Sequence, residues 1–207
     1  MNDYQKEQAE SLAIVRKYLA SLSGEQKETL IGTMSGYFSF RKVVDSFQLQ
    51  YFGNVCNLKC YQSRLSACCG RDGIITFFAD MVINALVSSE QDLDKLDAAV
   101  SNNNDTGMKC VYLGKNGCLW KIKPIVCEMF LCDSAMKEVF EKFPEAALKW
   151  DHLKQQEKLF KWPDQPVLFD YLEEIFLIAG YRSPLMYLHN SPGLLRIKQR
   201  AGMLGGC

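Results

Sequence analysis

The sequence lacks an excess of charge of either sign. Its 207 residues carry 24 Lys and Arg against 24 Asp and Glu, and they include no long run of basic residues. Because the affinity of proteins for nucleic acids comes largely from the neutralisation of phosphates, this balance disfavours a nucleic-acid partner. A protein partner remains compatible with it.

A long hydrophobic segment is also missing. The longest apolar stretch, residues 74–87, contains Asp80 and Asn84 and is too short to cross a bilayer. The first residues are polar and of mixed charge, without the basic and apolar regions of a secretory signal. We therefore expect a cytoplasmic protein with no membrane span.

Histidine is scarce, and closely spaced cysteine pairs are absent. His152 and His189 are the two histidines, and no two cysteines are separated by two residues, the spacing typical of zinc fingers. We expect His152 to lie on an exposed, charged helix face and His189 near a helix end. Nucleophile elbows, P-loops and dinucleotide-binding motifs are absent as well, so no enzyme class is indicated.

Cysteine, by contrast, is abundant and grouped. Eight of the nine cysteines lie in two groups of four, and Cys207 ends the chain. Because cytosolic thiols are kept reduced, this usage indicates metal binding or catalysis rather than disulfides. We predict that the two groups meet around metal and that Cys207 is a free thiol. The predicted ligands are Cys56, Cys60, Cys68 and Cys69 in the first group, and Cys110, Cys118, Cys127 and Cys132 in the second.

The second group has the local structure that such a site needs. Residues 109–113 and 118–122 are β-like and flank Asn116-Gly117, a strong hairpin signal. The hairpin would bring Cys110 and Cys118 together. Pro124 suits the first turn of a short helix, from which Cys127 would project.

The first group lies in residues 54–73, which we expect to form loops and turns. Cys68 and Cys69 are adjacent, and adjacent side chains of an extended chain point to opposite sides. They are therefore poor partners for one metal ion. Either each serves a different site, or the site is a cluster large enough to accept both, or one of them is structural.

Three interpretations of the cysteines compete. An iron–sulfur cluster needs four cysteines and tolerates irregular spacing, whereas zinc sites usually show tight pairs. The spacing thus favours iron–sulfur, with a [4Fe–4S] cluster first, for electron transfer or redox sensing. A zinc-stabilised structural or protein-interaction module is the alternative. The third interpretation, small buried apolar residues without metal, fits such grouping poorly.

Several motifs of this stretch resemble those of the YkgJ-type cysteine-cluster family, described as zinc- or iron-chelating proteins. The resemblance covers about residues 54–132, and Lys and Glu stand where the family has two arginines. Its elements are the adjacent cysteines Cys68-Cys69, Gly117-Cys118, Lys123-Pro124 and Cys127-Glu128-Met129-Phe130.

This resemblance implies a metal site built from both cysteine groups, but no single activity. One branch of the family resembles flagellin lysine methylases, which implies S-adenosylmethionine as a cofactor. Because no Gly-rich loop follows a predicted strand, the sequence supports a protein-modification enzyme only weakly.

Around the cysteines, apolar residues recur at helical spacing. We predict a mainly α-helical single domain, residues 1–207, with a small β-hairpin and cysteine-rich metal-binding loops. The cysteine-cluster core, 54–132, would be flanked by N-terminal helices in 1–53 and C-terminal helices in 133–207. We further expect a capping box at Ser23 and Gln26, a broken helix over 35–53, a helix over 77–87 capped by Thr76, and a helix stop at Gly180.

Overall fold

Helices with buried apolar stripes build most of this protein, for which we describe a computed structural model. The structure describes residues 2–57, 62, 69–70, 75–101, 110–115, 117–160 and 168–189. Two short strands form an antiparallel hairpin. The elements are α1 (Asp3–Ser21), α2 (Gly24–Thr33), α3 (Ser35–Tyr51), α4 (Phe78–Val87), α5 (Glu90–Ser101), β1 (Leu113–Gly114), β2 (Gly117–Cys118), α6 (Ile125–Glu128), α7 (Asp133–Lys142), α8 (Pro144–Glu157) and α9 (Leu168–Ile178).

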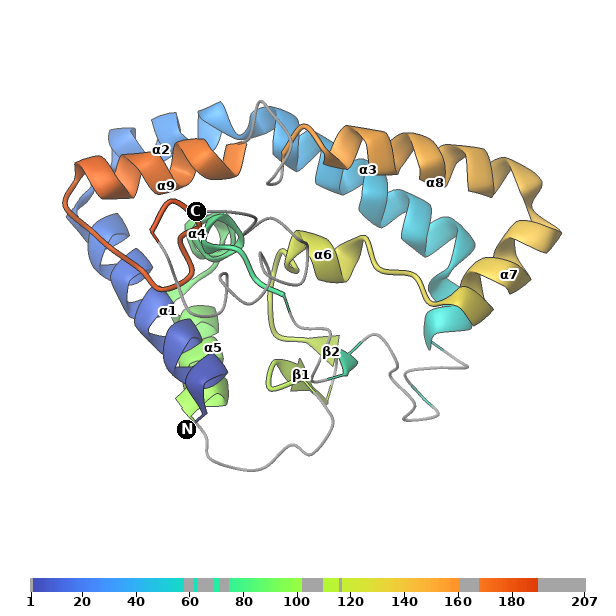
Figure 1. The fold of residues 1–207 in the computed structure, drawn as a ribbon, viewed down its shortest axis with the longest axis horizontal. Helices are drawn as coiled ribbons and strands as arrows, with labels where there is room; N and C mark the ends of the chain where they lie inside the picture. Colours follow the sequence, from blue (N-terminus) through green and yellow to red (C-terminus); the bar gives the residue numbers. More distant parts are fainter. Residues whose placement is uncertain are drawn as a thin grey trace, which may run out of the picture.

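Helix α4 lies at the centre of the fold and is seen end-on in Figure 1. Every residue from Phe78 to Ala85 is buried, including Asp80 and Asn84. A helix that is apolar on nearly all sides must be enclosed by others, and α4 packs against α1 and α9. Helix α1 also packs against α5.

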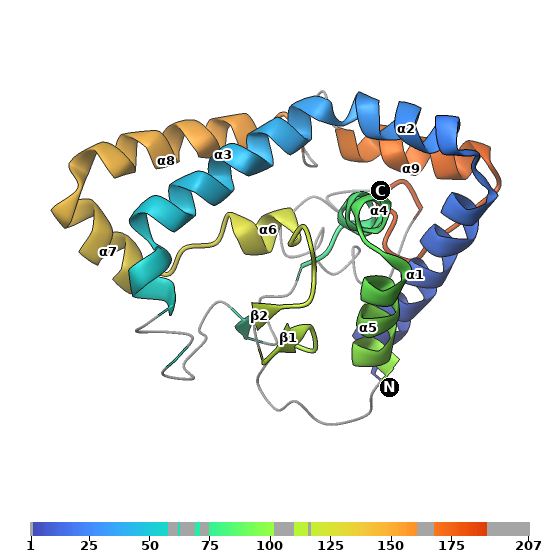
Figure 2. The same ribbon diagram turned by 180° about the vertical axis from the view of Figure 1, so that it is seen from behind.

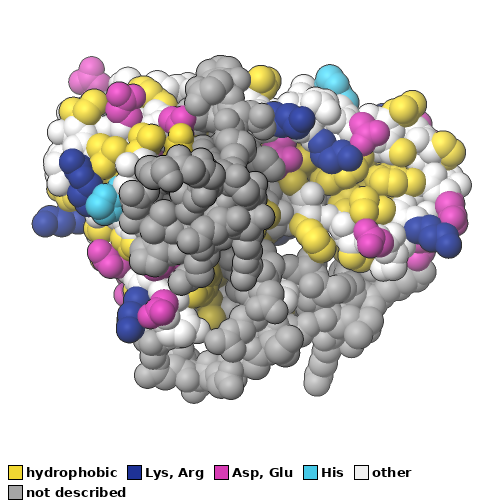
Figure 3. Space-filling view, viewed as in Figure 1, with side chains coloured by type: hydrophobic (Ala, Val, Ile, Leu, Met, Phe, Trp, Pro, Cys, Tyr) yellow, Lys and Arg dark blue, Asp and Glu magenta, His cyan; other side chains and the backbone are white. Residues whose placement is uncertain are grey.

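Two long helices form an upper layer. Helices α3 and α8 run side by side above α6, and both Figure 1 and the reverse view in Figure 2 show this arrangement. Phe47 of α3 stacks on Trp150 of α8 with ring centroids 5.5 Å apart. Hydrophobic side chains also reach the surface over these helices (Figure 3), where Val43 and Leu148 are exposed.

The hairpin and α6 lie below this layer. Figures 1 and 2 both show β1 and β2 beneath α6, and residues 119–124 connect β2 to α6. The resulting arrangement is mainly helical, compact and carries one small hairpin among the described residues, which confirms the predicted fold class. None of the helices in this described part is both long and apolar enough to cross a membrane.

Several local predictions are confirmed. The Ser23 hydroxyl accepts a hydrogen bond from the Gln26 N–H, and the Gln26 side chain accepts one from the Ser23 N–H, which completes the capping box of α2. Gly180 follows α9 with a φ of 85°, a left-handed conformation that suits glycine at a helix end.

Two local predictions are wrong. Helix α3 is continuous from Ser35 to Tyr51, because a stripe that includes Tyr37, Val44 and Phe47 is buried along its whole length. Thr76 does not cap α4. The carboxylate of Asp80 accepts the Phe77 N–H instead, at 2.9 Å.

Candidate functional site

Six of the eight predicted ligands lie in the described part of the chain. All six are thiols of intermediate burial. Cys60 and Cys68 lie outside the described residues, as does Cys207. The six are Cys56, Cys69, Cys110, Cys118, Cys127 and Cys132.

The two cysteine groups meet at Cys69 and Cys110. The N–H of Cys110 donates a hydrogen bond to the carbonyl oxygen of Cys69, with a nitrogen–oxygen distance of 2.9 Å. A backbone bond of this length fixes the two residues as neighbours. The structure therefore brings one cysteine of the first group beside the second group.

The hairpin places Cys118 near Cys110. Leu113 pairs with Cys118, and the Leu113 N–H donates to the carbonyl of Cys110 at 3.1 Å. Gly117 begins β2 with a φ of 112°, which glycine adopts without strain. The strands are two residues each, much shorter than the predicted 109–113 and 118–122, so Cys110 lies in the turn that precedes β1.

Burial governs the protonation of these two thiols. It raises the pKa of Cys110 to about 11, and the neighbouring Cys118 adds to the shift. Burial also raises the pKa of Cys118. Both groups are therefore neutral thiols at neutral pH unless a cation compensates the thiolate charge.

Cys127 lies in α6, the short helix that was predicted here, and Pro124 is the residue before that helix rather than part of its first turn. The charges of Cys127 and Cys110 both act on the buried phenol of Tyr4. Burial raises the pKa of Tyr4, and Tyr112, Cys110 and Cys127 each add to the shift, so the hydroxyl lies within electrostatic range of both thiols.

Two buried donors remain unused near these cysteines. The Thr76 hydroxyl beside Tyr4 already accepts a hydrogen bond from Gln8, and the Tyr4 hydroxyl has no hydrogen-bond partner among the described residues. The same is true of the indole N–H of Trp120, two residues after Cys118. Tyr112 lies edge-on to Trp120, with centroids 5.4 Å apart. Donors of this kind tune a sulfur-ligated centre when they reach its sulfurs.

Helix α4 holds the segment between Cys118 and Cys127. The side-chain oxygen of Asn84 accepts the N–H groups of Lys121 and Ile122 at 2.9 and 3.0 Å. One turn earlier, Asp80 accepts the N–H of Ile125 at 3.0 Å. Our sequence interpretation treated Asn84 only as an interruption of an apolar stretch, and Asp80 also as part of the step into a helix that resembles the cysteine-cluster family. Their four-residue spacing, which puts both on one helix face, was the available signal.

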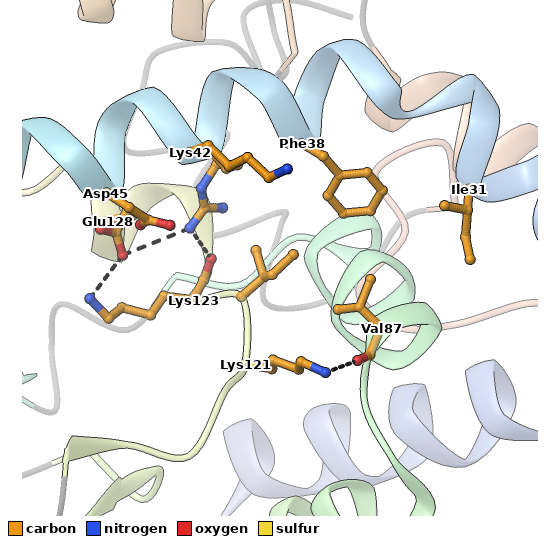
Figure 4. Close-up of a pocket in the computed structure, with 10 residues that line it drawn as sticks. Ile31, Phe38, Lys42, Asp45, Val87, Lys121, Lys123 and Glu128 are labelled. Atoms are coloured by element: carbon orange, nitrogen blue, oxygen red, sulfur yellow. Dashed lines mark hydrogen bonds and ion pairs between the residues drawn. The ribbon is translucent and has the colours of Figure 1, made fainter.

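Lys123 and Glu128, which stand where the resembling family has two arginines, form an ion pair with each other. Lys123 Nζ lies 3.0 Å from Glu128 Oε2, and buried Arg41 lies 3.8 Å from the same oxygen. Arg41 also donates to the carbonyl of Lys123, and Gln48 donates to the carbonyl of Glu128. Burial lowers the pKa of Lys123, but the charge and hydrogen bond of Glu128 outweigh it and raise the pKa overall. This cluster (Figure 4) anchors α6 to α3.

Three other residues singled out from the sequence lie on or beside helices α7, α3 and α8. They are Cys132, Cys56 and His152. Cys132 precedes α7, and its sulfur lies 3.3 Å from the Ser134 hydroxyl. Cys56 follows α3, where its N–H donates to the Phe52 carbonyl at 2.8 Å. His152 lines a groove between α3 and α8.

The donor set fits a thiolate-ligated metal, because soft thiolates from turns and a helix start can converge on one centre. Cys69, Cys110, Cys118 and Cys127 are the residues that would hold it. Within the described ranges, however, no three His, Cys, Asp or Glu residues lie close enough together to hold a metal ion.

Comparisons with known proteins add no relative. No family model matches the chain, and no match was found among curated proteins or solved structures.

Proposed function

We propose that this chain is a metal-binding protein whose centre is ligated by thiolates from both cysteine groups. A [4Fe–4S] cluster is the favoured centre, and Zn²⁺ is the alternative. The observation that carries the proposal is the hydrogen bond between Cys110 and Cys69, because it joins residues from the two groups. An iron–sulfur cluster would supply one-electron chemistry for electron transfer or redox sensing.

The protein environment supports this proposal in two further ways. The pKa values of Cys110 and Cys118 are raised by burial, so these thiols gain from a cation that compensates their charge. In addition, Asn84 and Asp80 fix the backbone between Cys118 and Cys127. A fixed backbone reduces the entropy that must be lost when ligands are brought onto one metal.

The first prediction concerns individual ligands. Replacing Cys110 or Cys127 by Ser should lower the metal bound per chain by on the order of tenfold, since a hydroxyl is a poor ligand for soft metals. The measurement is elemental analysis of anaerobically purified protein, together with acid-labile sulfide and the visible absorption spectrum. Iron with sulfide and visible absorption indicates a cluster; colourless protein with stoichiometric zinc indicates the alternative.

Two matched variants control this experiment. Cys132→Ser removes a thiol outside the proposed ligand set, and Cys207→Ser removes the thiol predicted to be free, so both variants should retain the metal. Far-UV circular dichroism of every variant establishes that the helices remain folded. Wild-type protein without iron, sulfide or zinc contradicts the proposal, as does equal metal loss in folded Cys127→Ser and Cys207→Ser.

A further inference from the structure

A separate pocket of about 360 Å³ lies between α3, the end of α4 and residues 121–123. One wall is apolar and is formed by Ile31, Phe38, Val87 and Ile122. The remaining wall carries charged side chains, four cationic and two acidic. They are Arg41, Lys42, Lys121, Lys123, Asp45 and Glu128.

Two of the four cations are already engaged. Lys123 is paired with Glu128 at 3.0 Å, and Lys121 donates to the carbonyl of Val87 at 2.5 Å. These bonds fix each of the two ammonium groups on an acceptor of the protein.

The other two cations retain unused donors. Lys42 is exposed and makes no hydrogen bond or ion pair with its ammonium group among the described residues. Arg41 is only 4% exposed, and its Nε has no hydrogen-bond partner there. A buried donor without a partner is costly and rare in native proteins, so it points to a bound group.

The acidic pair limits where a bound anion can lie. Figure 4 shows Asp45 and Glu128 together at one end of the pocket, whereas Phe38, Ile31 and Val87 line the other end. The Lys42 side chain extends between the two ends. A negative group would avoid the carboxylates and approach Lys42, and an attached apolar body would then contact Phe38.

We infer that this pocket binds a small organic anion with a single acidic head group and an apolar body. The head group interacts with Lys42 and the free Nε of Arg41, and the body packs against Phe38, Ile31 and Val87. The volume lies within the range of small-molecule sites, which combine mostly apolar walls with a few placed polar groups. This inference uses different side chains from the proposed cysteine centre and does not depend on it.

A pair of fluorescent probes tests the inference on the full-length chain. Anilinonaphthalene sulfonate has the required acidic head and aromatic body, and N-phenylnaphthylamine has the same body without the sulfonate. The sulfonate dye should bind more tightly than the uncharged dye, and its affinity should fall as salt screens the charges. Equal affinities for the two dyes would overturn the inference.

Matched variants locate the binding. Lys42→Gln should weaken the sulfonate dye by about fivefold, the upper range for an exposed ion pair, and leave the uncharged dye unchanged. Lys137→Gln, an exposed lysine on α7, should change neither. Phe38→Ser should weaken both dyes, whereas Leu148→Ser in the groove between α3 and α8 should weaken neither. Equal effects of the two lysine variants, or of the two serine variants, contradict the assignment to this pocket.

Discussion

At the scale of single residues, the carboxyl groups of Asp45 and Glu128 form a pair of like charges beside α6 (Figure 4). Burial raises the pKa of Asp45, and the charge of Glu128 raises it further against the opposing effects of Arg41 and Lys123. Glu128 is buried and held by both cations. Asp45 is the more exposed of the two carboxyl groups. The repulsion between them therefore acts mainly on Asp45 and raises its pKa.

The sign of this shift gives a pH prediction. Because the pKa of Asp45 is raised above its ordinary 3.8 in the folded state, ionisation of Asp45 destabilises the fold as pH rises through that folded pKa. Asp45→Asn should therefore raise the free energy of unfolding at pH 7, by about 0.5 kcal/mol or less because solvent screens an exposed group. Urea unfolding measures this gain, which should vanish below pH 3.8. A gain that persists or grows in acid would contradict it.

This residue cluster could not be predicted from the sequence. Arg41 and Glu128 lie far apart along the chain, and a charged residue in an amphipathic helix is usually solvated. Helical periodicity identifies which residues share a face, but it does not identify which faces meet. The sequence pointed to Lys123 and Glu128 only as departures from a family pattern, and it gave no sign that they pair.

At the scale of elements, α4 links the core to the cysteine segment. Asn84 is a polar residue on the mostly apolar helix α4. Its side-chain oxygen accepts hydrogen bonds from the backbone N–H groups of Lys121 and Ile122. Its own amide nitrogen is buried without a hydrogen-bond partner in the described part of the chain. The favourable contribution of this side chain therefore comes from its oxygen.

Asn84→Ala should thus lower the free energy of unfolding by about 2 kcal/mol, roughly 1 kcal/mol for each N–H left without an acceptor. Chemical denaturation monitored by circular dichroism measures the loss. Gln155→Ala on the exposed face of α8 is the control and should change stability by no more than about 0.5 kcal/mol. Equal effects of the two substitutions would show that Asn84 does not hold the cysteine segment.

Elements were predictable where the signal was local. The α2 capping box and the stop at Gly180 each depend on a few neighbouring residues, and both were predicted correctly. The presence of a hairpin was also predicted, but with longer strands than β1 and β2. The failures involve distant partners. Thr76 was available to cap α4, but its hydroxyl contacts Gln8 of α1. Strand length likewise depends on what covers the hairpin.

At the scale of the whole molecule, the two parts of the fold that are most distant in sequence are joined by a buried hydroxyl chain. Ser11 of α1 donates to the carbonyl of Glu7, and the Ser11 and Ser183 hydroxyls lie 2.7 Å apart. The Leu185 N–H donates to Ser183. Because Ser11 uses its hydrogen on Glu7, Ser183 is the donor of the shared bond.

This contact supports the prediction that the chain folds as one domain, and a double-mutant cycle tests it. Ser11→Ala and Ser183→Ala should each lower the free energy of unfolding by about 1 kcal/mol, because each leaves buried polar groups without a partner. The double variant should cost less than the sum of the two, by roughly 0.5 kcal/mol or more, since removal of both hydroxyls leaves neither one unsatisfied. Unfolding followed by both tryptophan fluorescence and circular dichroism should give one coincident transition in every variant. Strict additivity would show that the two ends do not meet, and separate transitions would show that they belong to different folding units.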